Sequence, residues 1–301
     1  MTKGILLMAY GTPASLDDVE AYYTHIRGGR KPSAEQLSDL VNRYAAIGGN
    51  SPLLRITHRQ AAKLQSVLAA KGSNVKVYAG MKHSPPFISA IIKEAVREGV
   101  TDLLCVALAP HYSTMSVGGY MRVVEEASAQ LAEKPKIKFI RSWHGRPDFI
   151  SLWVDRVNRA NGRLGDGASL VFSAHSLPER VLQLGDPYKQ QLLESSKLVA
   201  DRLRWKGWTF TFQSASQSGE KWLGPDVLEH LQSLYDKGSR TFLMAPIGFV
   251  SDHLEILYDI DVECVEWAKQ HDSRLARCES LNDSDDFISC LASLAAESGF
   301  V

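Results

Sequence analysis

The chain has 301 residues, of which 45% are hydrophobic and 23% charged, so it can bury a sizeable core without metal or disulfide support. Lysine and arginine total 34, as do aspartate and glutamate, and this balance gives no indication of a nucleic-acid partner. No segment reaches the length of about 18 apolar residues needed to span a membrane, and the N-terminus lacks the features of a signal peptide. We therefore expect a cytoplasmic protein without stable membrane insertion.

Eight short apolar segments alternate with longer amphipathic ones along the chain. The apolar segments are residues 4–10, 75–81, 102–110, 137–143, 169–175, 208–214, 240–249 and 275–280. Continuous apolar runs are typical of parallel strands that helices cover on both faces. Residues 57–72 predict one of these helices, because they are amphipathic and end on a glycine. The pattern indicates an α/β fold.

The eight strands are expected to form two sheets of four. Residues 161–168, between the fourth and fifth segments, are rich in glycine and polar residues, and the third segment of each half contains Ala-Pro. We predict two Rossmann-like domains, residues 1–160 and 161–301, each a four-stranded parallel sheet flanked by helices, with the active cleft between them. Ligands bind beyond the carboxyl ends of such strands. No phosphate-binding glycine motif is present, so a nucleotide is not implied.

His175 is the first candidate for chemistry, because it stands at the end of the apolar segment 169–175. A histidine that is merely hydrogen-bonded within a loop is the alternative. A ring in this position can exchange protons near neutral pH or bind a metal ion.

Residues 251–267 predict a helix with acidic residues on one face. Glu255, Asp259 and Glu263 recur every four residues, and we expect Ser251 or Asp252 to cap the helix start. The line of carboxylates is either a solvated helix face or a track for a cation. Oxygen ligands suit hard divalent ions, and imidazole extends the preference to iron and zinc.

Cationic and aromatic residues gather in the N-terminal part of the chain. The cations are Arg27, Arg30, Lys31 and Arg43, and the aromatics are Tyr10, Tyr22, Tyr23 and Tyr44. Ordinary surface charge is one interpretation. The other is that the guanidinium groups bind carboxylates bidentately, which would suit a flat apolar ligand with acidic edges.

Several motifs together carry a family resemblance. They include MAYGTP (8–13), YYTHIRGGRKP (22–32), GMKHSPPF (80–87), SAHSLPE (173–179), GDPY (185–188), FQSASQSGEKWLGPDV (212–227) and GFVSDHLEILYD (248–259). In this order they resemble the ferrochelatases, specifically the branch from monoderm bacteria that uses coproporphyrin III. The resemblance implies two Rossmann-like domains around a porphyrin, and insertion of Fe²⁺ into coproporphyrin III to form coproheme in haem biosynthesis. It also implies transient contact with neighbouring haem-pathway enzymes.

The resemblance further assigns roles to individual residues. It implies that His175 and Glu255 are the catalytic pair that handles metal and protons, with neutral His175 accepting a pyrrole proton, and that Tyr10 can ligate iron from the opposite porphyrin face. Asp259 and Glu263 match an acidic line that can hold a hydrated magnesium ion. The porphyrin-binding positions are Tyr10, Arg27, Arg43, Ser51 and Tyr120, with Lys82 and His83 lining the cleft.

Three departures and several alternatives remain open. Gly28 stands where a relative has a second arginine, Asn50 replaces an apolar residue, and His144 takes a position that is often tyrosine. Cys264, Cys278 and Cys290 are spaced too widely for the iron–sulfur cluster of some relatives, so we predict none. A chelatase for protoporphyrin IX or for another metal, and a porphyrin carrier without catalysis, are the competing hypotheses.

Overall fold

The computed structural model describes residues 2–165, 167–216 and 219–301. Asp166 of the glycine-rich stretch 161–168, and Gln217 and Ser218 of the motif 212–227, lie outside these ranges. Every predicted apolar segment overlaps a strand, which confirms the α/β prediction. The strands are β1 (Thr2–Ala9), β2 (Lys76–Met81), β3 (Val100–Ala107), β4 (Lys136–Ile140), β5 (Ser169–His175), β6 (Thr209–Gln213), β7 (Thr241–Ala245) and β8 (Arg274–Arg277).

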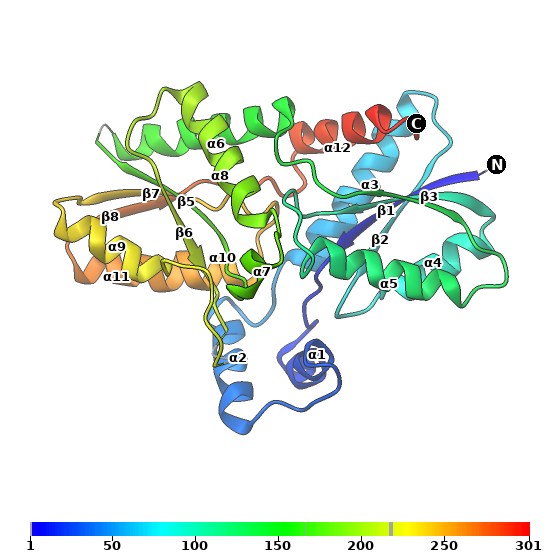
Figure 1. Cartoon of the computed structure of the whole chain (residues 1–301), viewed down its shortest axis with the longest axis horizontal. Coiled ribbons are helices and arrows are strands. Elements are labelled where there is room, and N and C mark those ends of the chain that lie inside the picture. The colour runs from blue at the N-terminus through cyan, green and yellow to red at the C-terminus, as the bar shows by residue number, and fades with distance from the viewer. Residues whose placement is uncertain (1, 166, 217–218) are drawn as a thin grey trace.

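The strands form two four-stranded parallel sheets with the same spatial order. The first runs β2-β1-β3-β4 and the second β6-β5-β7-β8, so each sheet places its first strand between its second and third. The two predicted four-stranded sheets are therefore present and share one topology, and Figure 1 shows them as the cores of two lobes. The carboxyl ends of β1 and β5 are central in their sheets, where ligand sites of open α/β folds occur.

Helices cover both faces of each sheet. They are α1 (Val19–Ile26), α2 (Ala34–Ala46), α3 (Leu53–Ala70), α4 (Ile88–Arg97), α5 (Val117–Ala129), α6 (Pro147–Leu164), α7 (Arg180–Gln183), α8 (Tyr188–Leu203), α9 (Val227–Asp236), α10 (Leu254–Tyr258), α11 (Val265–Gln270) and α12 (Asp285–Glu297). The predicted helix of residues 57–72 corresponds to α3, and Gly72 follows it with a positive φ of 79°, which suits glycine at a helix end. Helices α1 and α2 lie together below the two lobes in Figure 1.

The two lobes share one hydrophobic core. Leu7 of β1, Trp153 of α6, Leu170 of β5 and Phe287 of α12 belong to the same buried cluster. The C-terminal helix α12 packs on α3 of the first lobe and on α6, as Figure 1 shows at the top of the molecule. Helix α6 contains residue 160 and packs on β7 and β8. The division of the chain at residue 160 stays a prediction.

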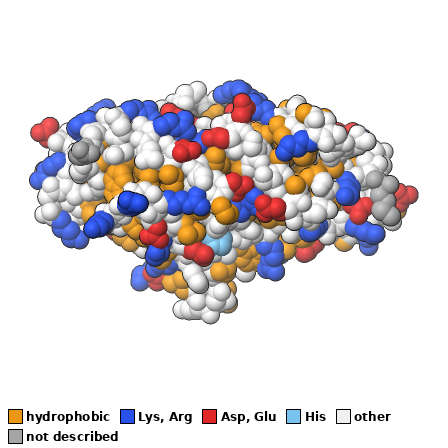
Figure 2. All heavy atoms as spheres, turned by 90° about the horizontal axis from the view of Figure 1, so that it is seen from above, with side chains coloured by type: hydrophobic (Ala, Val, Ile, Leu, Met, Phe, Trp, Pro, Cys, Tyr) orange, Lys and Arg blue, Asp and Glu red, His pale blue; other side chains and the backbone are white. Residues whose placement is uncertain are grey.

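The surface carries charges of both signs. Figure 2 shows Lys and Arg side chains interspersed with Asp and Glu over the face seen from above. Among the residues that the structure describes, no helix is both long and apolar enough to cross a bilayer.

Candidate functional site

His175 is presented at the carboxyl end of β5, as predicted. The backbone N–H of Ser176 donates to the Gln213 carbonyl at 2.8 Å, and the Ser176 hydroxyl donates to the Leu223 carbonyl at 2.7 Å. These bonds fix the chain directly after the histidine. The imidazole Nδ1 contacts the Ser176 carbonyl, and Nε2 lies 3.3 Å from Oε1 of Glu255. The structure therefore brings together the two residues predicted to form the catalytic pair.

The pair shifts the pKa of both members. Burial opposes protonation of His175, but the negative charge and hydrogen bond of Glu255 outweigh it and raise the His175 pKa to about 9. Burial alone would raise the pKa of Glu255, yet His175 and His253 hold it well below its ordinary value. At neutral pH the metal-free pair is an imidazolium and a carboxylate. This differs from the neutral ring expected from the sequence, because the carboxylate stands within hydrogen-bonding reach.

His253 is a site residue that the sequence analysis did not single out. Its Nε2 lies 3.4 Å from Oε2 of Glu255, its Nδ1 lies 3.0 Å from the Ser251 carbonyl, and its ring packs on Phe249. Glu255 therefore lies between two histidines, one on each carboxylate oxygen. The sequence feature that could have indicated His253 is its place two residues before Glu255, in the stretch DHLE (252–255).

The helix that carries Glu255 starts differently from the prediction. Its N-cap is His253, and neither Ser251 nor Asp252 caps it. The Ser251 hydroxyl instead accepts a hydrogen bond from the Gln60 side chain at 3.0 Å, and the Asp252 carboxylate accepts bonds from Ser280 and Asn282. Both side chains that local preference favours as helix caps are instead engaged in tertiary hydrogen bonds.

The acidic line follows a π-helix rather than the regular α-helix that was expected. Helix α10 ends at Tyr258, and a π-helix spans Asp259–Cys264, a wider turn that is frequent at functional sites. Asp259 is only 4% exposed, so it does not belong to a solvated face. Burial and the charge of Glu255 raise the Asp259 pKa to about 6, and burial raises that of half-buried Glu263.

The described residues contain no group of three or more His, Cys, Asp or Glu side chains arranged to hold a metal ion. Metal ligation by His175, Glu255, Tyr10, Asp259 and Glu263 stays a prediction.

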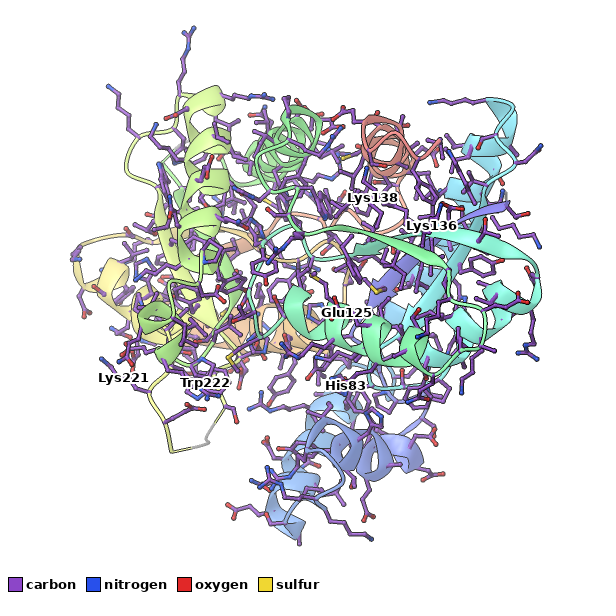
Figure 3. The ribbon with its side chains drawn as sticks, turned by 45° about the vertical axis from the view of Figure 1, so that its right-hand side comes forward. His83, Glu125, Lys136, Lys138, Lys221 and Trp222 are labelled. Atoms are coloured by element: carbon purple, nitrogen blue, oxygen red, sulfur yellow. The ribbon has the colours of Figure 1, made fainter. Side chains whose placement is uncertain are left out.

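Tyr10 and His83 stand together at the ends of β1 and β2. Their ring centroids are 4.5 Å apart, and Figure 3 shows His83 on the side of its lobe that faces α1. Although 43% of Tyr10 is exposed, loss of solvent around its phenol raises the pKa above its ordinary value, and the charge of Glu255 raises it further. Burial, Lys82 and His25 lower the His83 pKa to about 3, so this ring is neutral.

Lys82 and Tyr120 form a second contact in the same region. The Lys82 ammonium lies 5.5 Å from the centroid of the Tyr120 ring, and burial together with Arg122 lowers the Lys82 pKa. Tyr120 itself is buried, and the charge of Glu255 contributes to its raised pKa after burial. Tyr10 and Tyr120 of the first lobe are therefore within electrostatic reach of Glu255 in the second.

The predicted propionate-binding residues differ in how they are engaged. Arg27 has a buried Nε without a hydrogen-bond partner, and its guanidinium lies over Tyr23. Arg43 is paired with Asp39 at 3.1 Å and lies 3.7 Å from Asp259. The buried Ser51 hydroxyl accepts the Leu53 N–H. Of these groups, Arg27 retains capacity for an added anion.

Trp222 is another residue near the pair that the sequence analysis left without a role. Its ring centroid lies 6.4 Å from that of His175, and Figure 3 shows it on the second lobe.

The three departures from the family pattern lie elsewhere in the structure. Gly28 and Asn50 are exposed, and His144 bridges Ser142 and Glu194.

The predicted catalytic pair lines neither of two hollows formed by described residues of the surface. One of about 900 Å³ lies along the outer side of α1, and one of about 620 Å³ lies beside the loop between β8 and α12. The porphyrin cleft at His175 stays a prediction.

The three C-terminal cysteines are buried in two separate cores, Cys264 in one and Cys278 and Cys290 in the other.

Comparison with known proteins identifies the family. The ferrochelatase family model matches residues 2–298. The chain belongs to the ferrochelatase family.

Relatives of this ferrochelatase match it over nearly the whole length. A protein named ferrochelatase from Herpetosiphon aurantiacus is 43% identical, covering 95% of this chain and 96% of its own. Coproporphyrin III ferrochelatase 2 from Bacillus cereus is 42% identical, covering 98% and 93%. Coproporphyrin III ferrochelatase from Halalkalibacterium halodurans is 43% identical, covering 98% and 97%. The resemblance drawn from the motifs is confirmed.

Solved structures support the fold. SirB from Bacillus subtilis with Fe³⁺ superposes with a TM-score of 0.61 at 14% identity, covering 100% of this chain and 99% of that one. CbiX, described as the terminal enzyme for siroheme biosynthesis in denitrifying bacteria, gives 0.57 at 11% identity, covering 98% and 99%. At these identities the likeness concerns the chelatase fold alone.

Proposed function

We propose that this ferrochelatase inserts Fe²⁺ into coproporphyrin III to form coproheme, a step of haem biosynthesis. The observation that carries the proposal is the His175–Glu255 pair, 3.3 Å apart at the end of a central strand. Relatives named for coproporphyrin III, at 42% and 43% identity, support this substrate. Four unpaired buried cysteines suit a cytoplasmic location.

Iron must first exchange water for protein ligands. Glu255 supplies an oxygen and His175 an imidazole nitrogen, a donor set that suits Fe²⁺. Two protein donors leave coordination positions open, so the ion can pass to the porphyrin instead of being trapped. Asp259 and Glu263 continue the acidic line, and we propose that they guide the ion or hold a hydrated Mg²⁺.

Proton balance follows from the charge state of the pair. At neutral pH His175 of the metal-free pair is an imidazolium, with a proton on each ring nitrogen, and Fe²⁺ binding at Nε2, the nitrogen that faces Glu255, releases the Nε2 proton. As iron passes to the ring, two pyrrole protons leave. The freed imidazole accepts one of them and returns to its protonated state, while the other goes to solvent.

The first lobe holds the porphyrin. We propose that Arg27 binds a propionate, with Ser51, Tyr120 and Arg43 nearby, and that Lys82 and His83 line the ring. Binding energy from these contacts can offset distortion of the macrocycle, a strain of about 1–5 kcal/mol. We propose that Tyr10 ligates iron from the opposite face of the porphyrin. Transient contact with neighbouring haem-pathway enzymes belongs to the same proposal.

The test is anaerobic metallation of coproporphyrin III, followed by the Soret shift on adding Fe²⁺. The His175→Ala variant is expected to lose insertion while porphyrin binding, measured by tryptophan quenching, survives. His58→Ala, an exposed histidine on α3, is the matched control and keeps full activity. Full turnover in His175→Ala would remove the pair from the mechanism.

The same assay separates the competing hypotheses. A carrier gives binding spectra without metallation. Competition between coproporphyrin III and protoporphyrin IX, repeated with Co²⁺ and Ni²⁺, decides the substrate and the metal, and preferential metallation of protoporphyrin IX would overturn the proposed specificity.

A further inference from the structure

Gln213 is a buried residue at the end of β6 whose side chain uses both ends of its amide. It is 0% exposed and pairs in register with His175 of β5. Its Oε1 accepts the Ser173 hydroxyl at 2.9 Å. Its Nε2 donates to the Glu255 backbone carbonyl at 2.9 Å and lies 3.4 Å from Oδ2 of Asp259. One side chain therefore touches β5, α10 and the π-helix.

The contacts fall on both sides of the histidine. Ser173 lies two residues before His175, and Ser176, whose N–H donates to the Gln213 backbone carbonyl, follows it directly. The Gln213 amide also donates a hydrogen bond to the backbone carbonyl of Glu255, the partner of His175. The 3.3 Å separation of His175 and Glu255 thus spans two elements that Gln213 joins.

The chemistry of the amide determines its orientation. Rotating it by half a turn would place Oε1 against the Glu255 carbonyl and the Asp259 carboxylate, which are acceptors. A glutamate at this position would face the same two acceptors with oxygens alone. A methionine would fill similar space without either bond.

The next residue reinforces this arrangement. Ser214 has a φ of 61°, in the left-handed region that is uncommon for a residue other than glycine. In this conformation its hydroxyl donates to Oδ2 of Asp259. Such backbone strain persists where surrounding contacts hold it and clusters at functional sites.

We propose that Gln213 is a positioning residue for metal transfer, whose amide fixes the separation and relative orientation of His175 and Glu255. The inference rests on the proposed function, in which that pair receives the iron. Gln213 itself stays out of contact with the metal. Its loss is therefore expected to impair metal transfer and leave porphyrin binding intact.

The experiment compares Gln213→Met, Ser173→Ala and the double variant with wild type. The double variant removes the buried Ser173 hydroxyl that Gln213→Met leaves without its partner, which limits nonspecific destabilisation. Gln65→Met is the matched control. Gln65 also uses both amide ends, on Val75 and Val77, but it joins α3 to the segment around β2 in the first lobe.

Four readouts are taken from each variant: thermal midpoint, porphyrin affinity, kcat and KM for Fe²⁺, and the visible absorption of bound Co²⁺ as a probe of metal geometry. We expect both Gln213 variants to lose about tenfold or more in kcat/KM for Fe²⁺ and to alter the Co²⁺ spectrum, with porphyrin affinity within about twofold. Ser173→Ala and Gln65→Met should retain the wild-type Co²⁺ spectrum.

The inference is overturned if the double variant keeps the wild-type Co²⁺ spectrum and kcat/KM. It is also overturned if activity falls only in proportion to the thermal midpoint, as in Gln65→Met, or if the double variant fails to fold, because Gln213 is then simply structural. His175→Ala in the same assay distinguishes the two levels. Retained activity there ends the proposed function, whereas loss there with intact Gln213 variants ends only this inference.

Discussion

Tyr188 connects His175 to the contact between the two lobes. Its hydroxyl donates to the His175 backbone carbonyl at 3.0 Å, and its own N–H donates to Oδ1 of Asp186 at 3.0 Å. The other carboxylate oxygen of Asp186 accepts the Ser113 hydroxyl at 3.0 Å and the Thr114 N–H at 2.7 Å. Ser113 and Thr114 follow β3 in the first lobe, so one carboxylate joins both lobes beside His175.

Asp186→Ala is therefore expected to destabilise the protein. The substitution leaves several partly buried donors without an acceptor, which we expect to lower the free energy of unfolding by about 2–4 kcal/mol. Urea unfolding measures this. Asp201→Ala, an exposed residue paired with Lys197 one turn away, should change it by less than about 0.5 kcal/mol. Equal effects of the two substitutions would contradict the role of Asp186.

The His175–Glu255 pair predicts a pH-dependent stability. The His175 pKa is about 9 in the folded protein and about 6.5 when unfolded. A raised pKa contributes stability that is fully present below pH of about 6.5 and is lost as pH rises through about 9. Glu255 has the opposite sign, because its depressed pKa contributes stability above its unfolded value that is lost in acid.

Glu255→Gln removes the partner, so its unfolding free energy should approach that of wild type as pH rises from about 6.5 to about 9.5. Urea unfolding of metal-free protein at several pH values measures the difference, and His175→Ala should remove the same dependence. A difference that stays constant over this range would exclude the coupling.

Arg27 and Arg43 should differ in their importance for porphyrin binding. Arg27 has a free buried Nε, whereas Arg43 already serves Asp39 and Asp259. We expect Arg27→Met to weaken coproporphyrin III binding about tenfold, the value of one charge-assisted hydrogen bond, and Arg43→Met to weaken it less than about threefold. Arg97→Met, at an exposed position at the end of α4, is the control. A stronger effect of Arg43 would show that its ion pairs open for the ligand.

The strands were predictable because each is a short apolar run with turns or polar segments at both ends. The approach of His175 and Glu255 followed from the strand-end position and the family motifs. The cap at His253 did not, because Gln60 and Asn282, distant in sequence, engage Ser251 and Asp252. Local capping preferences carry no information about hydrogen-bond partners that are distant in sequence.

The π-helix at Asp259–Cys264 was likewise beyond sequence periodicity, since spacings of four residues fit a regular helix. His253 and Trp222 belong to no periodic pattern, and their importance depends on the fold placing them beside Glu255 and His175. The raised pKa of His175 follows from its pairing with a carboxylate 80 positions away, but its extent depends on burial and distance, which the sequence does not give.

The approach of Gly248 to β5 gives the last prediction. Gly248 donates its N–H to the Ser173 carbonyl at 3.1 Å, and a Cβ at this position would lie 2.8 Å from Cα of Ala174, the residue before His175. Backbone must shift to relieve this contact, so Gly248→Ala should cost about 1–3 kcal/mol of stability and displace the end of β5. Gly162→Ala is the matched control, because no atom lies within 4 Å of its added Cβ in α6, and there the change should stabilise by up to about 1 kcal/mol. Urea unfolding and Fe²⁺ insertion measure both variants. If Gly248→Ala retains wild-type stability and turnover, the close approach at Ala174 does not constrain His175.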